Sequence, residues 1–198
     1  MPLAALRITA DARKDRRCPF TLPPFSVHGS AQREATLNIR YISLQGRGQT
    51  DACLTAAVRL MQRAGLRLAG TFALETEDPS CDMQLQVLPD GPVIRINQNL
   101  GAMAKGCRLD GGALEQAVME VSTRTEGAQL LIVNKFGKLE SSGRGFVPLI
   151  VQALEQGIPV LIGVNTLNLS DLLEFAGDMA QALPEDPAAI AAWALGSA

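Results

Sequence analysis

Residues 45–51 (QGRGQTD) bring together groups that can bind a phosphate, between a predicted strand and a predicted helix. Backbone N–H groups of a glycine-rich loop and the positive end of a helix attract anions. Aligned with the phosphate-loop pattern GxxxxGK(S/T), residues 43–50 read SLQGRGQT, so Ser43 replaces the first glycine and Gln49 replaces the lysine. The pattern predicts phosphate or oxyanion contacts, with a plain glycine turn as the alternative. The predicted contacts are Gly46, Arg47, Gly48, Gln49 and Thr50.

A second candidate segment, residues 134–145 (NKFGKLESSGRG), contains three cations and three glycines. It follows a predicted buried strand and leads into a predicted helix, a setting that suits an oxyanion. Nucleotide hydrolases commonly end this strand in a carboxylate that holds Mg²⁺. Here Asn134 and Lys135 stand in place of that carboxylate, and Glu140 is the carboxylate nearest to them in the segment. The alternative is a solvated loop. The predicted ligand contacts of this segment are Asn134, Lys135, Lys138 and Arg144.

A third cluster surrounds the cysteines. The four cysteines form no CxxC pair, so the sequence does not predict a zinc site. Cys107 lies between cations, including Arg108, that would lower the pKa of its thiol if they approached it. Cys81 and Cys107 flank a predicted hairpin and could come together as a thiol pair with redox or soft-metal chemistry, whether or not they form a disulfide. Two ordinary semi-buried cysteines are the alternative.

Composition excludes several classes of protein. The chain has 198 residues, 47% of them hydrophobic and 19% charged, as in ordinary globular proteins. A net charge of -2 gives no general attraction to nucleic acid. We find neither a long uncharged apolar run nor the apolar core of a signal peptide, so we expect no membrane span and a cytoplasmic location. His28 is the one histidine, which argues against a multi-histidine metal site.

Charge divides the chain near residue 36. Residues 1–36 carry six basic and three acidic side chains and four prolines, whereas the remainder carries twelve basic and seventeen acidic side chains. We therefore predict a flexible basic N-terminal arm over residues 1–36. Residues 37–198 are predicted to form a single α/β domain, which is long enough to bury a core.

Apolar periodicity predicts alternating strands and helices in residues 37–198. Strands are expected at 38–44, 66–74, 129–134 and 159–164, with a hairpin of 82–88 and 93–97 turned at 89–92. Helices are expected from a Thr50 or Asp51 cap to 64, and at 110–125, 143–156, 170–182 and 187–195. This order indicates a three-layer α/β fold, with a mainly parallel sheet, helices on both faces and a small β-hairpin insertion. Ligands of such sheets bind outside the carboxyl ends of the strands.

Three strings, LLIVNKFGKLESSGRG, GCRLDGGALEQAV and GIPVLIGVN, resemble a bacterial family of domains of unknown function. Members of that family are often encoded beside molybdenum-transport genes, and the resemblance covers roughly residues 38–182. The order of elements is more distantly similar to small P-loop nucleoside triphosphatases. This sequence departs from their pattern at Gln49 and at Asn134 and Lys135, which argues against hydrolysis while leaving phosphate binding in place.

These observations together predict an accessory protein that binds a small anionic ligand and is not a competent hydrolase. The ligand is a nucleotide, ATP or GTP, or a tetrahedral oxyanion such as molybdate. The family resemblance implies partners in molybdenum transport or cofactor supply. One alternative is a noncanonical Mg²⁺-dependent nucleoside triphosphatase or phosphotransferase, with Thr50 on the metal, Asp51 or Glu140 in support and Arg144 stabilising charge. Another is a non-catalytic interaction domain that uses residues 134–145.

Overall fold

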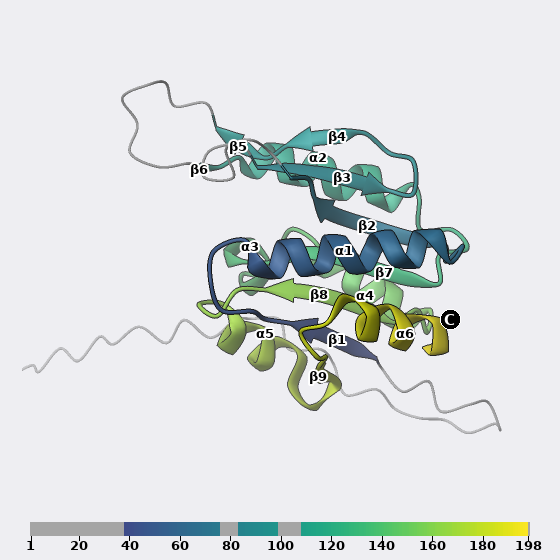
Figure 1. Cartoon of the computed structure of the whole chain (residues 1–198). Coiled ribbons are helices and arrows are strands. Elements are labelled where there is room, and N and C mark those ends of the chain that lie inside the picture. Colours follow the sequence, from purple (N-terminus) through teal and green to yellow (C-terminus); the bar gives the residue numbers. More distant parts are fainter. Residues whose placement is uncertain (1–37, 76–82, 99–107, 198) are drawn as a thin grey trace, which may run out of the picture.

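The computed structural model describes residues 38–75, 83–98 and 108–197, and Figure 1 shows how their elements are arranged. The predicted arm of residues 1–36 lies outside the described residues. Within the described residues, the main sheet has the strand order β4-β3-β2-β7-β8-β1-β9. Its strands are β1 (Ile39–Ile42), β2 (Leu68–Ala73), β3 (Gln84–Leu88), β4 (Val93–Arg95), β7 (Leu130–Phe136), β8 (Val160–Val164) and β9 (Ala180–Ala182). A second, two-stranded sheet pairs β5 (Asn97–Gln98) with β6 (Arg108–Leu109).

Helices connect these strands and cover both faces of the main sheet (Figure 1). They are α1 (Gln49–Arg63), α2 (Gly111–Ser122), α3 (Lys138–Ser141), α4 (Val147–Glu155), α5 (Leu169–Ala176), the 3₁₀ turn η1 (Gly177–Met179) and α6 (Pro187–Ser197). Side chains of α1 and α6 share one buried cluster with Ile132 and Leu161 of the sheet. Side chains of α2, α4 and α5 share another with Val133 and Ile162. Neighbouring residues of β7 and of β8 thus enter opposite cores.

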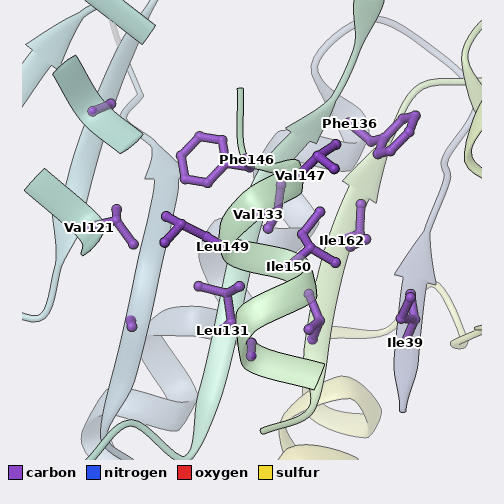
Figure 2. Close-up of a cluster of buried hydrophobic side chains, with 14 of the residues drawn as sticks. Ile39, Val121, Leu131, Val133, Phe136, Phe146, Val147, Leu149, Ile150 and Ile162 are labelled. Atoms are coloured by element: carbon purple, nitrogen blue, oxygen red, sulfur yellow. The ribbon is translucent and has the colours of Figure 1, made fainter. Parts of the chain in front are cut away.

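The central strands are apolar because both of their faces are buried, as in other parallel sheets. In Figure 2, α4 lies over this part of the sheet and places Phe146, Leu149 and Ile150 beside side chains from β7 and β8. Phe136, at the end of β7, packs against Phe175 of α5 with their ring centroids 5.6 Å apart. The carboxyl end of β7 is therefore packed against α4 and α5 on one face of the sheet.

The predicted three-layer, mainly parallel arrangement is confirmed, and the hairpin turned at residues 89–92 is also present. The hairpin is not a separate insertion, since β3 pairs with β2 and extends the main sheet. Asp110 caps α2, as expected, by accepting the backbone N–H of Ala113 at 3.1 Å.

Four predicted boundaries were wrong. The helix expected at 170–182 stops at Ala176, before a left-handed Gly177, and residues 180–182 instead form β9, which pairs with β1. The helix expected from residue 143 begins at Val147, after the short α3. Strand β7 continues past Asn134 to Phe136. Finally, α1 begins at Gln49 with Gly48 as its N-cap, so neither Thr50 nor Asp51 caps it.

The strand order places the candidate segments at one edge of the sheet. Strands β2, β7, β8, β1 and β9 are parallel to one another, so their carboxyl ends lie together. From β1 the chain crosses to β2 on one side, and from β8 it crosses to β9 on the other. The first connection runs through α1 on one face and the second through α5 on the other, so the two leave the sheet on opposite faces at β1 and β8. Open α/β sheets bind ligands at such a point. Figure 1 shows the loop before α1 and the short α3 at this same edge.

Gly70 of β2 lies against the backbone of β7, and substituting it should therefore destabilise the sheet. Its φ is +113°, and a Cβ there would overlap the carbonyl oxygen of Ile132 on β7. We expect Gly70→Ala to lower the free energy of unfolding by about 3 kcal/mol or more, because both strain and overlap must be relieved. Gly157→Ala is the matched control: its φ is +72°, with nothing within 4 Å of the added carbon. It should cost about 1–2 kcal/mol in the same urea titration. Equal losses would contradict close packing at Gly70.

Candidate functional site

The loop between β1 and α1 presents backbone donors at the carboxyl edge of the sheet. Gly46 and Gly48 have φ values of +95° and +76°, a left-handed conformation that glycine adopts without strain. Gly48 is the N-cap of α1 and brings no side chain to it. The first hydrogen bond of the helix runs from the N–H of Ala52 to the carbonyl of Gly48, at 2.9 Å. The N–H groups of residues 49–51 therefore have no acceptor within the helix, and they carry its positive end.

Thr50 closes this loop from within. Its side chain is buried, and its Oγ1 accepts the backbone N–H of Leu44 at 3.0 Å. Below it lies Gly163 of β8, where a Cβ would be 3.2 Å from Leu54 Cδ2 and 3.5 Å from both Thr50 Cγ2 and the side-chain amide of Asn134. The start of α1 thus packs directly over β8 and beside the end of β7.

Three side chains meet where α1 passes the end of β7, and we call them the Asp51 cluster: Asp51, Asn134 and Lys135. The ammonium of Lys135 lies 3.0 Å from Asp51 Oδ2. In the amide orientation that satisfies both of its neighbours, Asn134 donates from Nδ2 to Asp51 Oδ1 at 2.9 Å. Its Oδ1 then accepts the backbone N–H of Ala73, on β2, at 2.8 Å. Both carboxylate oxygens of Asp51 are thereby engaged by β7.

A bulge at the end of β7 explains how two consecutive residues reach the same carboxylate. Successive strand residues normally point to opposite faces. Here Asn134 aligns with Gly163 and Phe136 aligns with Val164, so Lys135 is the extra residue of an irregular register. Such bulges change the direction of a side chain at the rim of a sheet. Asn134 is consequently buried, with 3% exposure, while the side chain of Lys135 is 42% exposed.

Glu140 fixes the segment that follows β7. Its carboxylate is buried and accepts two backbone N–H groups, from Gly137 at 3.0 Å and from Phe146 at 3.2 Å. Burial raises the pKa of this carboxyl above its ordinary value, and these hydrogen bonds offset only part of that effect. Gly145 must lack a side chain, because a Cβ would overlap Glu140 Oε1. One internal carboxylate therefore shapes the whole turn from residue 137 to residue 146.

The predicted contact residues occupy two neighbouring places at this edge. Arg47 lies in the loop before α1 and Gln49 is the first residue of α1, both exposed. Lys138 begins α3 and Arg144 follows it, and these two are also exposed. The structure brings Thr50, Asn134 and Lys135 together around Asp51. Asp51 was predicted as a helix cap or a metal support, and its pairing with β7 was not predicted. The sequence did contain a signal for this pairing. Lys135 stands where phosphate-loop proteins have an acidic residue, and the acidic residue Asp51 stands at the start of the helix that follows the loop.

Other candidates have less structural support. Cys81 and Cys107 lie outside the described residues, and Arg108 belongs to β6. Cys53 of α1 is a buried free thiol, and burial raises its pKa, which disfavours the reactive thiolate. Across the described ranges, we find no group of three or more metal-ligating His, Cys, Asp or Glu side chains. The described helices are all too short or too polar to cross a membrane.

Comparison with known proteins identifies relatives of this chain. A family model described as "Protein of unknown function (DUF2478)" matches residues 39–193. A protein of Bradyrhizobium diazoefficiens named "Molybdenum import ATP-binding protein ModC 2" is 32% identical over 147 residues, or 72% of this chain. That stretch is 16% of the length of the relative, so the chain corresponds to a small part of it.

Two solved structures resemble the fold. The crystal structure of THEP1 from Aquifex aeolicus has a TM-score of 0.55 and 14% sequence identity, covering 76% of this chain and 91% of THEP1. The solution structure of a human cancer-related nucleoside triphosphatase has a TM-score of 0.45 and 12% identity, covering 74% of this chain and 87% of that one. The likeness to THEP1 agrees with the predicted fold class, a mainly parallel α/β sheet with helices on both faces.

Glu140 makes the stability of the protein depend on pH. Because its pKa is raised in the folded protein, the folded state binds more protons than the unfolded state between the ordinary value of 4.5 and the raised one. The free energy of unfolding should therefore fall as the pH rises through this interval. The Glu140→Gln variant lacks this titration, so wild type should lose stability relative to the variant from about pH 4.5 upward.

Denaturant unfolding from about pH 4 to about pH 8 measures this difference. Glu155→Gln is the control, since it removes an exposed carboxylate at the end of α4 and should change stability by no more than about 0.5 kcal/mol. Wild-type and Glu140→Gln profiles that stay parallel throughout would contradict the raised pKa of Glu140.

Proposed function

This chain belongs to the DUF2478 family, and we propose that it is an accessory protein that binds a nucleotide or a tetrahedral oxyanion without hydrolysing it. One observation carries the proposal. Two left-handed glycines lead from the end of β1 into α1, whose N-terminus has no side-chain cap, at the point where the connections from β1 and β8 leave the sheet on opposite faces. Backbone N–H groups and the helix dipole there favour a phosphate or a similar anion.

Nearby cations support an anionic ligand. Arg47 is exposed in the loop itself, and Lys135 stands over the first turn of α1 through its contact with Asp51. Lys138 and Arg144 lie on the turn that Glu140 holds at the same edge. An arginine can grip two oxygens of one ligand, whereas a lysine acts as a point charge. We assign binding to these four cations together with the backbone of residues 46–50.

The residues present argue against hydrolysis. Gln49 stands where the phosphate loop has the lysine that reaches the outer phosphates. The end of β7 offers an amide whose two ends are both engaged, by Asp51 and by Ala73. Hydrolysis by related folds depends on charge stabilisation from that lysine and from a metal-bound carboxylate. We therefore propose binding, with a regulatory or carrier role, over turnover.

The ligand and its partners follow from the relatives. The Bradyrhizobium relative carries "ATP-binding" and "molybdenum import" in its name. These words favour ATP, and secondarily molybdate, as the ligand, and molybdenum-transport proteins as the partners. Because the chain corresponds to only 16% of that relative, the transport step itself is assigned to other parts of such systems.

Ligand-dependent thermal unfolding tests the proposal. We expect ATP or GTP, or molybdate but not sulfate, to raise the melting temperature. A ligand present at about 100 times its dissociation constant adds roughly 2.7 kcal/mol to the free energy of unfolding. This corresponds to a shift of several degrees, roughly 2–4 °C per kcal/mol for a domain of this size. If none of these ligands shifted the transition, the binding proposal would fail.

A pair of variants at Gly48 locates the ligand. Asparagine and aspartate both tolerate the left-handed conformation of this position, where an added Cβ has nothing within 4 Å. We expect Gly48→Asp to abolish most of the ligand-induced shift, because it places a negative charge at the N-terminus of α1. Gly48→Asn adds nearly the same volume without the charge and should retain more of the shift. Equal binding by both variants would place the ligand elsewhere.

A further inference from the structure

Proteins with a phosphate loop commonly bind a divalent cation beside it. In P-loop nucleoside triphosphatases, Mg²⁺ is held by a loop hydroxyl and a strand carboxylate, and it neutralises the phosphates. The corresponding donors here do not fit the ion. The hydroxyl oxygen of Thr50 accepts a backbone N–H inside the loop. Asn134 directs its oxygen to the Ala73 N–H and its Nδ2 to Asp51, so it presents no unused oxygen.

Lys135 is the strongest disagreement with a metal site. A fixed ammonium 3.0 Å from Asp51 Oδ2 already neutralises the carboxylate that would otherwise attract a cation. It would also repel a divalent ion placed beside it. The bulge in β7 turns the side chain of Lys135 toward α1, so the position of this ammonium follows from the register of the sheet.

We propose that Lys135 supplies from the protein the positive charge that Mg²⁺ supplies in related folds, so that this site binds its phosphate ligand free of metal. This inference rests on the proposed function and narrows its ligand to a metal-free phosphate anion. The ammonium has three donors, of which Asp51 takes one, and its side chain is 42% exposed. It can therefore donate to a ligand at the first turn of α1 without leaving its place.

Asp51 acts as the internal competitor in this arrangement. Its carboxylate lies in the first turn of α1 and receives donors from Asn134 and Lys135. In the free protein it holds the lysine over the helix N-terminus. When an anion binds, the same negative charge opposes it. Asp51 thus positions Lys135 and at the same time limits affinity, so that substitutions of the two residues should change binding in opposite directions.

The metal requirement provides the first test. The full chain is titrated calorimetrically with ADP, ATP and inorganic pyrophosphate, once in excess EDTA and once in excess Mg²⁺. We expect affinity in EDTA to equal or exceed affinity in Mg²⁺. Binding seen only with Mg²⁺ would overturn the inference and leave the proposed function standing. Absence of binding by these ligands, by GTP and by molybdate in both buffers would overturn both.

Charge variants provide the second test, in EDTA with the ligand that binds most tightly. Lys135→Met should weaken binding about tenfold or more, because it removes a charge-assisted donor. Asp51→Asn keeps most of the shape and should tighten binding several-fold. Arg63→Met removes one positive charge from the far end of α1, about 20 Å away, and should change affinity less than about twofold.

Weaker binding by Lys135→Met together with tighter binding by Asp51→Asn would distinguish the proposed role of Lys135 from damage to the fold. Damage would weaken binding in both variants. Melting curves without ligand confirm that each variant is folded. If Lys135→Met bound as tightly as wild type, or if Asp51→Asn bound more weakly, Lys135 would not be the substitute for the metal.

Discussion

The apposition of α1 to the ends of β7 and β8 is the constraint on which the site depends. Thr50 of α1 and Asn134 of β7 both lie beside Gly163 of β8, each 3.5 Å from the place where a Cβ of that glycine would be. Asp51 then lies within reach of β7, and its carboxylate joins the helix to that strand through two donors. Asn134 extends the connection to the backbone of β2, at Ala73. A carboxylate in the first turn also suits the dipole of the helix, so the local preference and the tertiary contact agree.

Two carboxylates shape this edge of the sheet in different ways. Asp51 is partly exposed and is balanced by an ammonium, whereas Glu140 is buried and receives only backbone N–H groups. The first keeps α1 and β7 together, and the second folds the turn that carries Lys138 and Arg144. Burial without a counterion raises the pKa of Glu140, which shows that the geometry of the turn is maintained at some electrostatic cost.

Most of the fold was predictable from the sequence because it follows from apolar periodicity. The runs QLLIVN and PVLIGV are typical of buried parallel strands, and they form the centre of the sheet. The segment 180–182 was not predictable, because its pairing with β1 is a long-range contact that overrides the local helical pattern. In the site, the loop glycines and the residue types at positions 134 and 135 were recognisable. The bulge that aims Lys135 at Asp51 was not, since it depends on the register between β7 and β8.

The arrangement of charge around α1 is inverted relative to the phosphate-loop pattern. That pattern places a lysine at the start of the helix and a carboxylate at the strand end, which together with a metal suit a polyphosphate. Here the carboxylate, Asp51, is on the helix, and the lysine, Lys135, is on the strand, while Gln49 takes the position of the loop lysine. The helix and the strand still attract each other, so the fold is retained. In the metal-free binding that we propose, Lys135 on the strand takes the place of the metal beside the anion. The absent loop lysine and the absent strand carboxylate then belong together, as two features of a site that recognises the anion directly.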